Sequence, residues 1–163
     1  MSRTFAIRLA SESEASSVFT LIKEFQAVRR LVDPSAISAS RILAAMRGSP
    51  PSTHLYLAFD EQQTIAGFAL WYEGFSVYRG GSVYHIDAVF VRAPYKEQGL
   101  SHQLLTFIAT QAAERNIAGI AWLSAKNDPE EQQFVEQLGV RPYDNLRFVF
   151  VKLSEIQRAL AKR

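Results

Sequence analysis

The segment from Val89 to Gln103 combines residue types that could hold a phosphate group. It reads Val-Phe-Val-Arg-Ala-Pro-Tyr-Lys-Glu-Gln-Gly-Leu-Ser-His-Gln, which predicts a strand, a short loop and the start of a helix. Gly99 and the small Ser101 let the loop backbone turn tightly and approach a ligand closely. Unpaired N–H groups at a helix N-terminus attract a phosphate or pyrophosphate, and Lys96 adds a positive charge beside them. The alternative is that this loop binds no ligand and only connects the strand to the helix.

Two titratable side chains, His85 and Asp87, precede this loop on the same predicted strand. Residues two apart on a regular strand point to one face, about 6.6 Å apart, and we expect Val89 and Val91 to continue that face. A carboxylate and an imidazole on an apolar strand are costly to bury without partners. Both are candidates for acid–base chemistry. The alternative is that they satisfy each other or nearby backbone groups.

The remaining pattern predicts the elements that must position these residues. Strands are expected at 5–9, 54–59, 65–75 and 82–91, within 117–124, and at 146–153. Helices are expected after Ser11 or Ser13, at 38–46, from the loop to about 115, from Pro129 to Gly139 with Asp128 as cap, and at 154–162. A run of strands followed by alternating helices and strands predicts an α/β (mixed α+β) fold.

Composition narrows the class of protein. A chain of 163 residues with 48% hydrophobic and 21% charged residues suits one globular domain. It has no cysteine, which excludes disulfides, thiolate metal sites and a cysteine nucleophile, and we expect no metal. The net charge is +2 without a dense basic stripe, so we expect no nucleic-acid partner. No signal peptide or membrane-spanning run is evident, so we expect a cytoplasmic protein.

The run Lys96-Glu-Gln-Gly99-Leu-Ser101 resembles the acetyl-CoA-binding motif of the GNAT superfamily, R/Q-x-x-G-x-G/A, with Lys and Ser at its two variable ends. The segments 67–72, 84–91, Asn127-Asp-Pro and 134–139 also look GNAT-like. The resemblance covers nearly the whole chain and is nearest to the diamine (spermidine/spermine-type) acetyltransferases. It implies a single GNAT domain over 1–163: a central mixed, mostly antiparallel twisted sheet with helices on both faces.

The resemblance also implies which residues contact acetyl-CoA. The N–H groups from Gln98 to Ser101 would hold the pyrophosphate, and the backbone of Phe90 and Val91 would pair with the pantetheine arm. Asn127 would hydrogen-bond the pantetheine, or else only start its own helix. The full expected set is Val89, Phe90, Val91, Lys96, Glu97, Gln98, Gly99, Leu100, Ser101, Asn127 and Phe134.

For catalysis, the resemblance places Asp87 where diamine acetyltransferases carry a glutamate base, with His85 as a second candidate. The family's usual acid is a tyrosine on the helix after Asn127. The matching residue here is Phe134 or Val135, so Tyr143, Tyr84 or water would have to protonate the thiolate. Glu73 could attract a cationic substrate or be a solvated edge charge. Trp71, Tyr72, Phe75 and Tyr78 could line a substrate cleft or belong to the core.

The expected function is acetyl transfer from acetyl-CoA to a primary amine, polyamine-like or amino-acid-like, by direct attack in a ternary complex. Two alternatives stay open at this point: a non-catalytic acyl-CoA-binding module, and an acetyltransferase that modifies protein N-termini or lysines. Exposed strands and a C-terminal helix leave room for a homodimer.

Overall fold

The computed structural model describes residues 4–29, 37–47, 53–124, 129–143, 151 and 153–160. The chain divides into two compact units, residues 1–122 and 123–163, which are described separately below. The expectation of a single domain stays a prediction.

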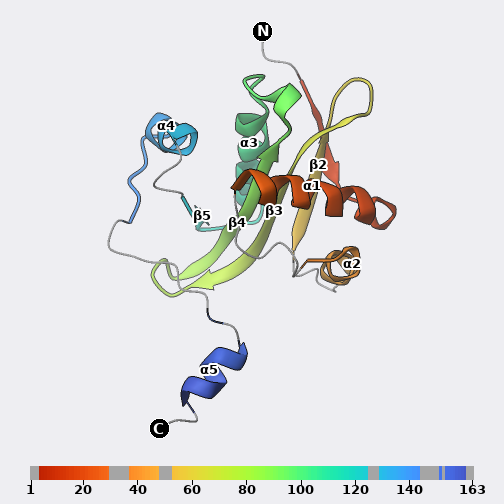
Figure 1. The fold of residues 1–163 in the computed structure, drawn as a ribbon. Coiled ribbons are helices and arrows are strands. Elements are labelled where there is room, and N and C mark those ends of the chain that lie inside the picture. The colour runs from red at the N-terminus through yellow and green to blue at the C-terminus, as the bar shows by residue number, and fades with distance from the viewer. Residues whose placement is uncertain are drawn as a thin grey trace. The chain divides into compact units, whose positions relative to one another are not determined.

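The first unit is built on a five-stranded sheet with the strand order β1-β2-β3-β4-β5 (Figure 1). Its first four strands are antiparallel neighbours, and β5 runs parallel to β4. The strands are β1 (Ala6–Leu9), β2 (His54–Phe59), β3 (Ile65–Ser76), β4 (Gly81–Val91) and β5 (Gly119–Trp122). The prediction of a mixed, mostly antiparallel sheet is confirmed.

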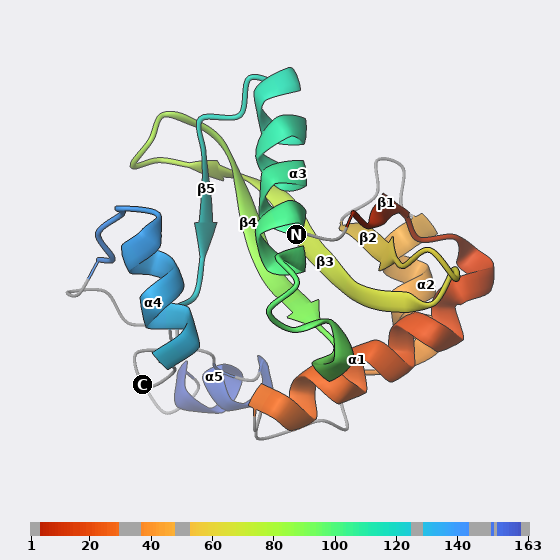
Figure 2. The same ribbon diagram turned by 90° about the horizontal axis from the view of Figure 1, so that it is seen from above.

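Helices cover both faces of this sheet (Figure 2). Helix α3 (Leu100–Glu114) packs on one face through Leu100, Leu104, Ile108 and Ala112, the fourfold-spaced apolar stripe of its sequence. Helices α1 (Ala15–Arg29) and α2 (Ala39–Arg47) pack on the other. The two faces are called the α3 face and the α1–α2 face below.

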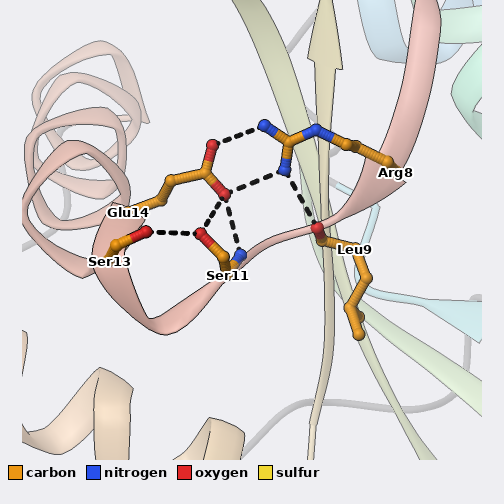
Figure 3. Close-up of polar contacts among 5 residues, drawn as sticks. All are labelled: Arg8, Leu9, Ser11, Ser13 and Glu14. Atoms are coloured by element: carbon orange, nitrogen blue, oxygen red, sulfur yellow. Dashed lines mark hydrogen bonds and ion pairs between the residues drawn. The ribbon is translucent and has the colours of Figure 1, made fainter.

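The turn from β1 into α1 is organised around one carboxylate (Figure 3). Oε2 of Glu14, in the short 3₁₀ helix η1 (Glu12–Glu14), accepts hydrogen bonds from the Ser11 amide at 2.7 Å and the Ser11 hydroxyl at 2.8 Å. The Arg8 guanidinium donates to both oxygens of Glu14, at 2.7 and 2.9 Å. These contacts lower the pKa of Glu14 to about 2, the bond from Arg8 contributing most. The predicted helix start at Ser11 is therefore confirmed.

A β-bulge interrupts β4 at Asp87. Leu70 of β3 lies opposite Ala88, but the next residue, Trp71, lies opposite Ile86, so Asp87 is an extra residue on β4. The inserted residue reverses which side chains face which side in the rest of the strand. Ala88 and Phe90 consequently point to the α1–α2 face, and Val89 and Val91 to the α3 face.

The bulge separates residues that were expected to share a face. Asp87 lines a pocket on the α1–α2 face, and His85 stacks on Tyr72, which has the same orientation on β3 as Leu70 of that face. The prediction that Val89 and Val91 lie on the same face as His85 and Asp87 was wrong, because it assumed a strand without a bulge.

The second unit contains α4 (Pro129–Gln137) and α5 (Leu153–Leu160). Gly139 follows α4 with a φ of 65°, in agreement with the predicted stop. Leu153, predicted as the end of a strand, instead begins α5. The rest of the strand predicted at 146–153, apart from Val151, and the cap Asp128 lie outside the described residues.

Candidate functional site

Strands β4 and β5 lie side by side over only part of β4. Residues Val83–Ile86 pair with Gly119–Trp122, whereas β3 follows β4 as far as Val91. From the bulge at Asp87 onward, the β5 side of β4 therefore has no strand partner in the described part of the chain. Such an edge presents backbone N–H and C=O groups that an extended amide-containing chain can bond. Val89, Phe90 and Val91 belong to this edge, as the pantetheine-binding prediction requires.

The loop after β4 reverses direction through two backbone positions with positive φ. A 3₁₀ turn, η3 (Ala93–Tyr95), leads to Lys96, and both Lys96 and Glu97 are exposed. Glu97 has a φ of 64°, and Gly99 caps α3 with a φ of 80°. Residues with a Cβ rarely adopt these angles, so the glycine suits this turn.

The first turn of α3 carries backbone N–H groups that have no backbone acceptor among the described residues. The amides of Gly99, Leu100, Ser101 and His102 donate to no backbone carbonyl among the described residues, whereas the Gln98 amide points at the Tyr95 carbonyl at 3.4 Å. Three of the four amides expected to bind pyrophosphate are therefore available. Oriented N–H groups at the positive end of a helix suit a pyrophosphate, so these residues fit the phosphate-bearing part of acetyl-CoA.

Contacts from distant parts of the chain brace this loop. Arg92 donates to both carboxylate oxygens of Glu24 on α1, at 2.6 and 2.9 Å, and keeps the pKa of Glu24 below its usual value. The Gln103 side chain accepts a hydrogen bond from the Phe5 amide at 3.3 Å. Sequence reasoning missed these braces, because the partners lie 68 and 98 residues apart and no local pattern links them.

Asp87 lines a pocket, and its carboxyl group has no polar partner among the described residues. It makes no hydrogen bond or ion pair with any described residue, and the residue is exposed to solvent on its open side. The protein around it nevertheless removes enough water to raise its pKa above the usual value. An unpaired carboxylate with a raised pKa beside a pocket is a candidate base.

The pocket beside Asp87 has a volume of about 360 Å³ and lies on the α1–α2 face. Its described lining comes from α1, α2 and the sheet, and includes Gln26, Arg41 and Thr53 besides apolar side chains. The Gln26 Oε1 atom is buried and accepts no hydrogen bond from the described residues. Sequence reasoning missed this pocket, because it depends on how α1 and α2 pack over the sheet.

His85 lies against Tyr72, its partner across β3. Their rings stack with centroids 5.2 Å apart and an angle of 17°. The imidazole also covers Gly74, where an added Cβ would lie 3.1 Å from Cδ2 and 3.3 Å from Nε2. No hydrogen bond or ion pair joins His85 to Asp87 within the described structure, so the alternative that they satisfy each other is wrong. The stack fixes the orientation of the imidazole.

The aromatic residues considered as cleft residues separate into three groups. Trp71 is 1% exposed and stacks with His54 and Tyr56 on the α3 face, so it belongs to the core. Tyr84 is also 1% exposed within that cluster, which places this candidate acid on the face opposite the pocket. Tyr72 stacks on His85, whereas Phe75 and Tyr78 are largely exposed near the turn between β3 and β4.

The structure gives less information about four other residues that the sequence suggested for the site. Glu73 forms an ion pair with Arg115 at 3.1 Å, so it is not a lone edge charge. Asn127 lies outside the described residues. Phe134 lies within α4, and Tyr143, an alternative acid, is exposed in the second unit. Their roles stay predictions.

Metal-binding clusters and membrane-spanning helices are both absent from the described residues. Within the described ranges, no group of three or more His, Asp or Glu side chains could hold a metal ion. No helix in the described part of the chain is long and apolar enough to cross a membrane.

The chain is similar to acetyltransferases in sequence and fold. It is 24% identical to the thialysine N-epsilon-acetyltransferase of Bos taurus over 116 residues, covering 67% of this chain and 68% of that protein. It is 26% identical to the L-ornithine N5-acetyltransferase of Arabidopsis thaliana over 83 residues, which is 51% of this chain and only 36% of the relative.

The fold matches a solved aminoglycoside acetyltransferase from an uncultured soil metagenomic sample with a TM-score of 0.74 and 17% identity, covering 91% of this chain and 96% of the other. Residues 19–140 match the Acetyltransferase (GNAT) family. The chain therefore belongs to the GNAT acetyltransferase family, a family of acyltransferases that use acetyl-CoA.

Proposed function

We propose that this chain transfers the acetyl group of acetyl-CoA to a small primary amine by direct attack, with Asp87 as the base. The observation that carries the proposal is the position of Asp87. It is the bulged residue of β4, at the point where β4 stops pairing with β5, and its carboxyl group faces a pocket without a partner among the described residues. Asp87 thus lies both at the edge of β4 proposed to bind acetyl-CoA and in the pocket proposed to bind the amine.

The chemistry requires a neutral amine, because its lone pair attacks the thioester carbonyl carbon. The Asp87 carboxylate, directly or through one water, accepts a proton from the nitrogen as the C–N bond forms. The C–S bond then breaks, and the CoA thiolate takes up a proton from solvent. A thiolate is a stable enough leaving group for water to serve here, since thiols have pKa values near 8.5.

The other residues of the proposed site bind acetyl-CoA or assist the proton transfer. The amides of Gly99, Leu100 and Ser101 hold the pyrophosphate, Lys96 adds charge beside it, and the edge of β4 pairs with the pantetheine arm. We assign to His85, which stacks on Tyr72 on the Asp87 side of the sheet, the relay of a proton through water; the stack supports this assignment by orienting the ring.

The proposal is tested with acetyl-CoA and a panel of alkylamines, diamines, amino acids and a peptide with a free N-terminus. We expect CoA release that depends on the amine, an acetylated product by mass spectrometry, and intersecting initial-velocity lines, which indicate a ternary complex. Parallel lines would indicate a covalent acetyl-enzyme instead. Binding of acetyl-CoA without any amine-dependent turnover would favour the non-catalytic module, and turnover with the peptide alone would favour the protein acetyltransferase.

A further inference from the structure

The walls of the Asp87 pocket are predominantly apolar. They include Ile22 of α1, Ile42 and Met46 of α2, and Leu55 and Leu70 of the sheet. Ile22, Ile42 and Leu55 are at most 7% exposed, so these walls are part of the packed core rather than a mobile surface. A pocket of about 360 Å³ with such walls suits a small, largely apolar molecule.

Polar groups in the described lining are few and differ in what they can bind. Asp87 is the acidic side chain, and it can hold a single ammonium group. Gln26 offers an amide whose buried Oε1 accepts no hydrogen bond from the described residues, and this oxygen can accept one from an ammonium group. Arg41 also lines the pocket, and its guanidinium offers a second ammonium group no acceptor.

Resting on the proposed amine acetylation, we infer that the acceptor is a primary monoamine with an aliphatic or aromatic body, rather than a polyamine. The amine enters with its nitrogen at Asp87 and its apolar body against Leu55, Leu70 and Met46. Each methylene buried there strengthens binding about fourfold. A second ammonium on the same body would have to leave water for an apolar wall, which is unfavourable without a counter-charge.

Matched pairs of amines test the inference on the parent protein. Butylamine and hexylamine are compared with 1,4-diaminobutane and 1,6-diaminohexane, which differ from them by one terminal ammonium. We expect kcat/KM to rise about fifteenfold from butylamine to hexylamine, which differ by two methylenes. We also expect hexylamine to exceed 1,6-diaminohexane at least tenfold, after correction for the two equivalent amines of the diamine.

A charge placed in the pocket wall should invert this preference. Met46 is only half-buried, so Met46→Asp adds a carboxylate to the wall with little risk to folding. We expect it to lower kcat/KM for hexylamine and to raise it for 1,6-diaminohexane. Ala44→Asp is the matched control, because it adds the same charge to the exposed side of α2. It should leave both values unchanged.

The outcomes separate the inference from the proposed function. Diamines acetylated as well as or better than monoamines, or no gain with chain length, would overturn the inference while leaving amine acetylation intact. Failure of all four amines, with acetyl-CoA still raising the melting temperature and no turnover in the wider panel, would overturn the proposed function itself.

Discussion

The hydroxyl of Tyr95 donates a 2.8 Å hydrogen bond to Oδ2 of Asp60, tying the loop that begins α3 to the turn between β2 and β3. Asp60 is 6% exposed, and its other carboxylate oxygen accepts the amides of Gln62 and Thr64 at 2.9 and 2.8 Å. A charged group this deeply buried requires such partners. The bond thus couples the rigid turn to the loop proposed to hold pyrophosphate.

Tyr95→Phe removes this bond and should loosen the loop. We expect the free energy of unfolding to fall by about 1.5–3 kcal/mol, the range for a hydrogen bond to a charged group. The KM for acetyl-CoA should rise about fivefold with kcat nearly unchanged, because binding and not chemistry is affected. Denaturant unfolding and steady-state kinetics measure both. Tyr78→Phe, at a side chain 90% exposed, is the control and should change neither. An unchanged KM would show that the brace does not position the loop.

Gly99→Val should abolish the rise in melting temperature caused by acetyl-CoA. A β-branched residue is strained at a φ of 80°, and its side chain would block the approach of a pyrophosphate. Gly80→Val is the matched control, since Gly80 has a φ of 67° and no atom within 4 Å of an added Cβ. Both variants should lose stability through backbone strain. If Gly99→Val binds acetyl-CoA as well as Gly80→Val does, the cofactor binds elsewhere.

Gly74→Ala probes the role of the imidazole without removing it. The new Cβ would lie 3.1 Å from Cδ2 of His85, so the ring must shift by a few tenths of an ångström. We expect a three- to tenfold loss of kcat and a small change in melting temperature, with a larger kcat loss in His85→Gln. Gly119→Ala, where an added Cβ meets nothing within 4 Å, should retain full activity. Full activity in both Gly74→Ala and His85→Gln would assign His85 a purely structural role.

Glu14→Gln should change how stability depends on pH. Because the folded state lowers the pKa of Glu14 to about 2 from 4.5, the carboxylate stabilises the fold above about pH 4.5. This contribution is lost as the pH falls from about 4.5 toward 2. We expect the variant to be less stable by about 1 kcal/mol at neutral pH, a value limited by solvent screening. The gap from the parent should narrow over that range in urea unfolding. Glu136→Gln, on the exposed side of α4, is the control; an equal effect there would contradict the assignment.

Local sequence patterns predicted the helices and strands well, but they predicted irregularities and boundaries of these elements less well. The strand His54–Phe59 and the buried stripe of α3 follow from residue type and spacing alone. The bulge at Asp87 could not be predicted in this way, since it depends on the register with Leu70 and Trp71 on another strand. The strand predicted to end at Leu153 shows the opposite error, where an apolar residue at the start of an amphipathic helix was assigned to the preceding strand.

The candidate site was predicted as a list of residues rather than as an arrangement. A glycine before a predicted helix, together with the GNAT resemblance, selected this loop as a candidate phosphate-binding site. Two titratable residues on an apolar strand, with the same resemblance, selected Asp87 and His85 as candidates for acid–base chemistry. The pocket that gives Asp87 its environment was not predictable, because it forms only when α1 and α2 pack over β2 and β3.

The raised pKa of Asp87 has a consequence for stability that separates a catalytic from a structural role. A carboxylate whose folded pKa lies above its unfolded value opposes folding once it is ionised, so its penalty is present above the folded pKa and vanishes below about pH 3.8. Asp87→Asn should therefore be as stable as the parent at neutral pH, or slightly more stable. A structural role would instead require a loss of stability.

The turnover number of Asp87→Asn, measured per folded molecule with acetyl-CoA and the best amine of the panel, tests the central claim most directly. Asparagine keeps the shape of the side chain but cannot accept the proton. We expect kcat to fall by about 10²–10⁴, with unchanged acetyl-CoA affinity. The loss should shrink as the pH rises past about 10.4, the usual pKa of an alkylammonium group, because most of the amine is then neutral without help from a base. An Asp87→Asn protein that is stable, binds acetyl-CoA and turns over at the parental rate at pH 7 would contradict the account.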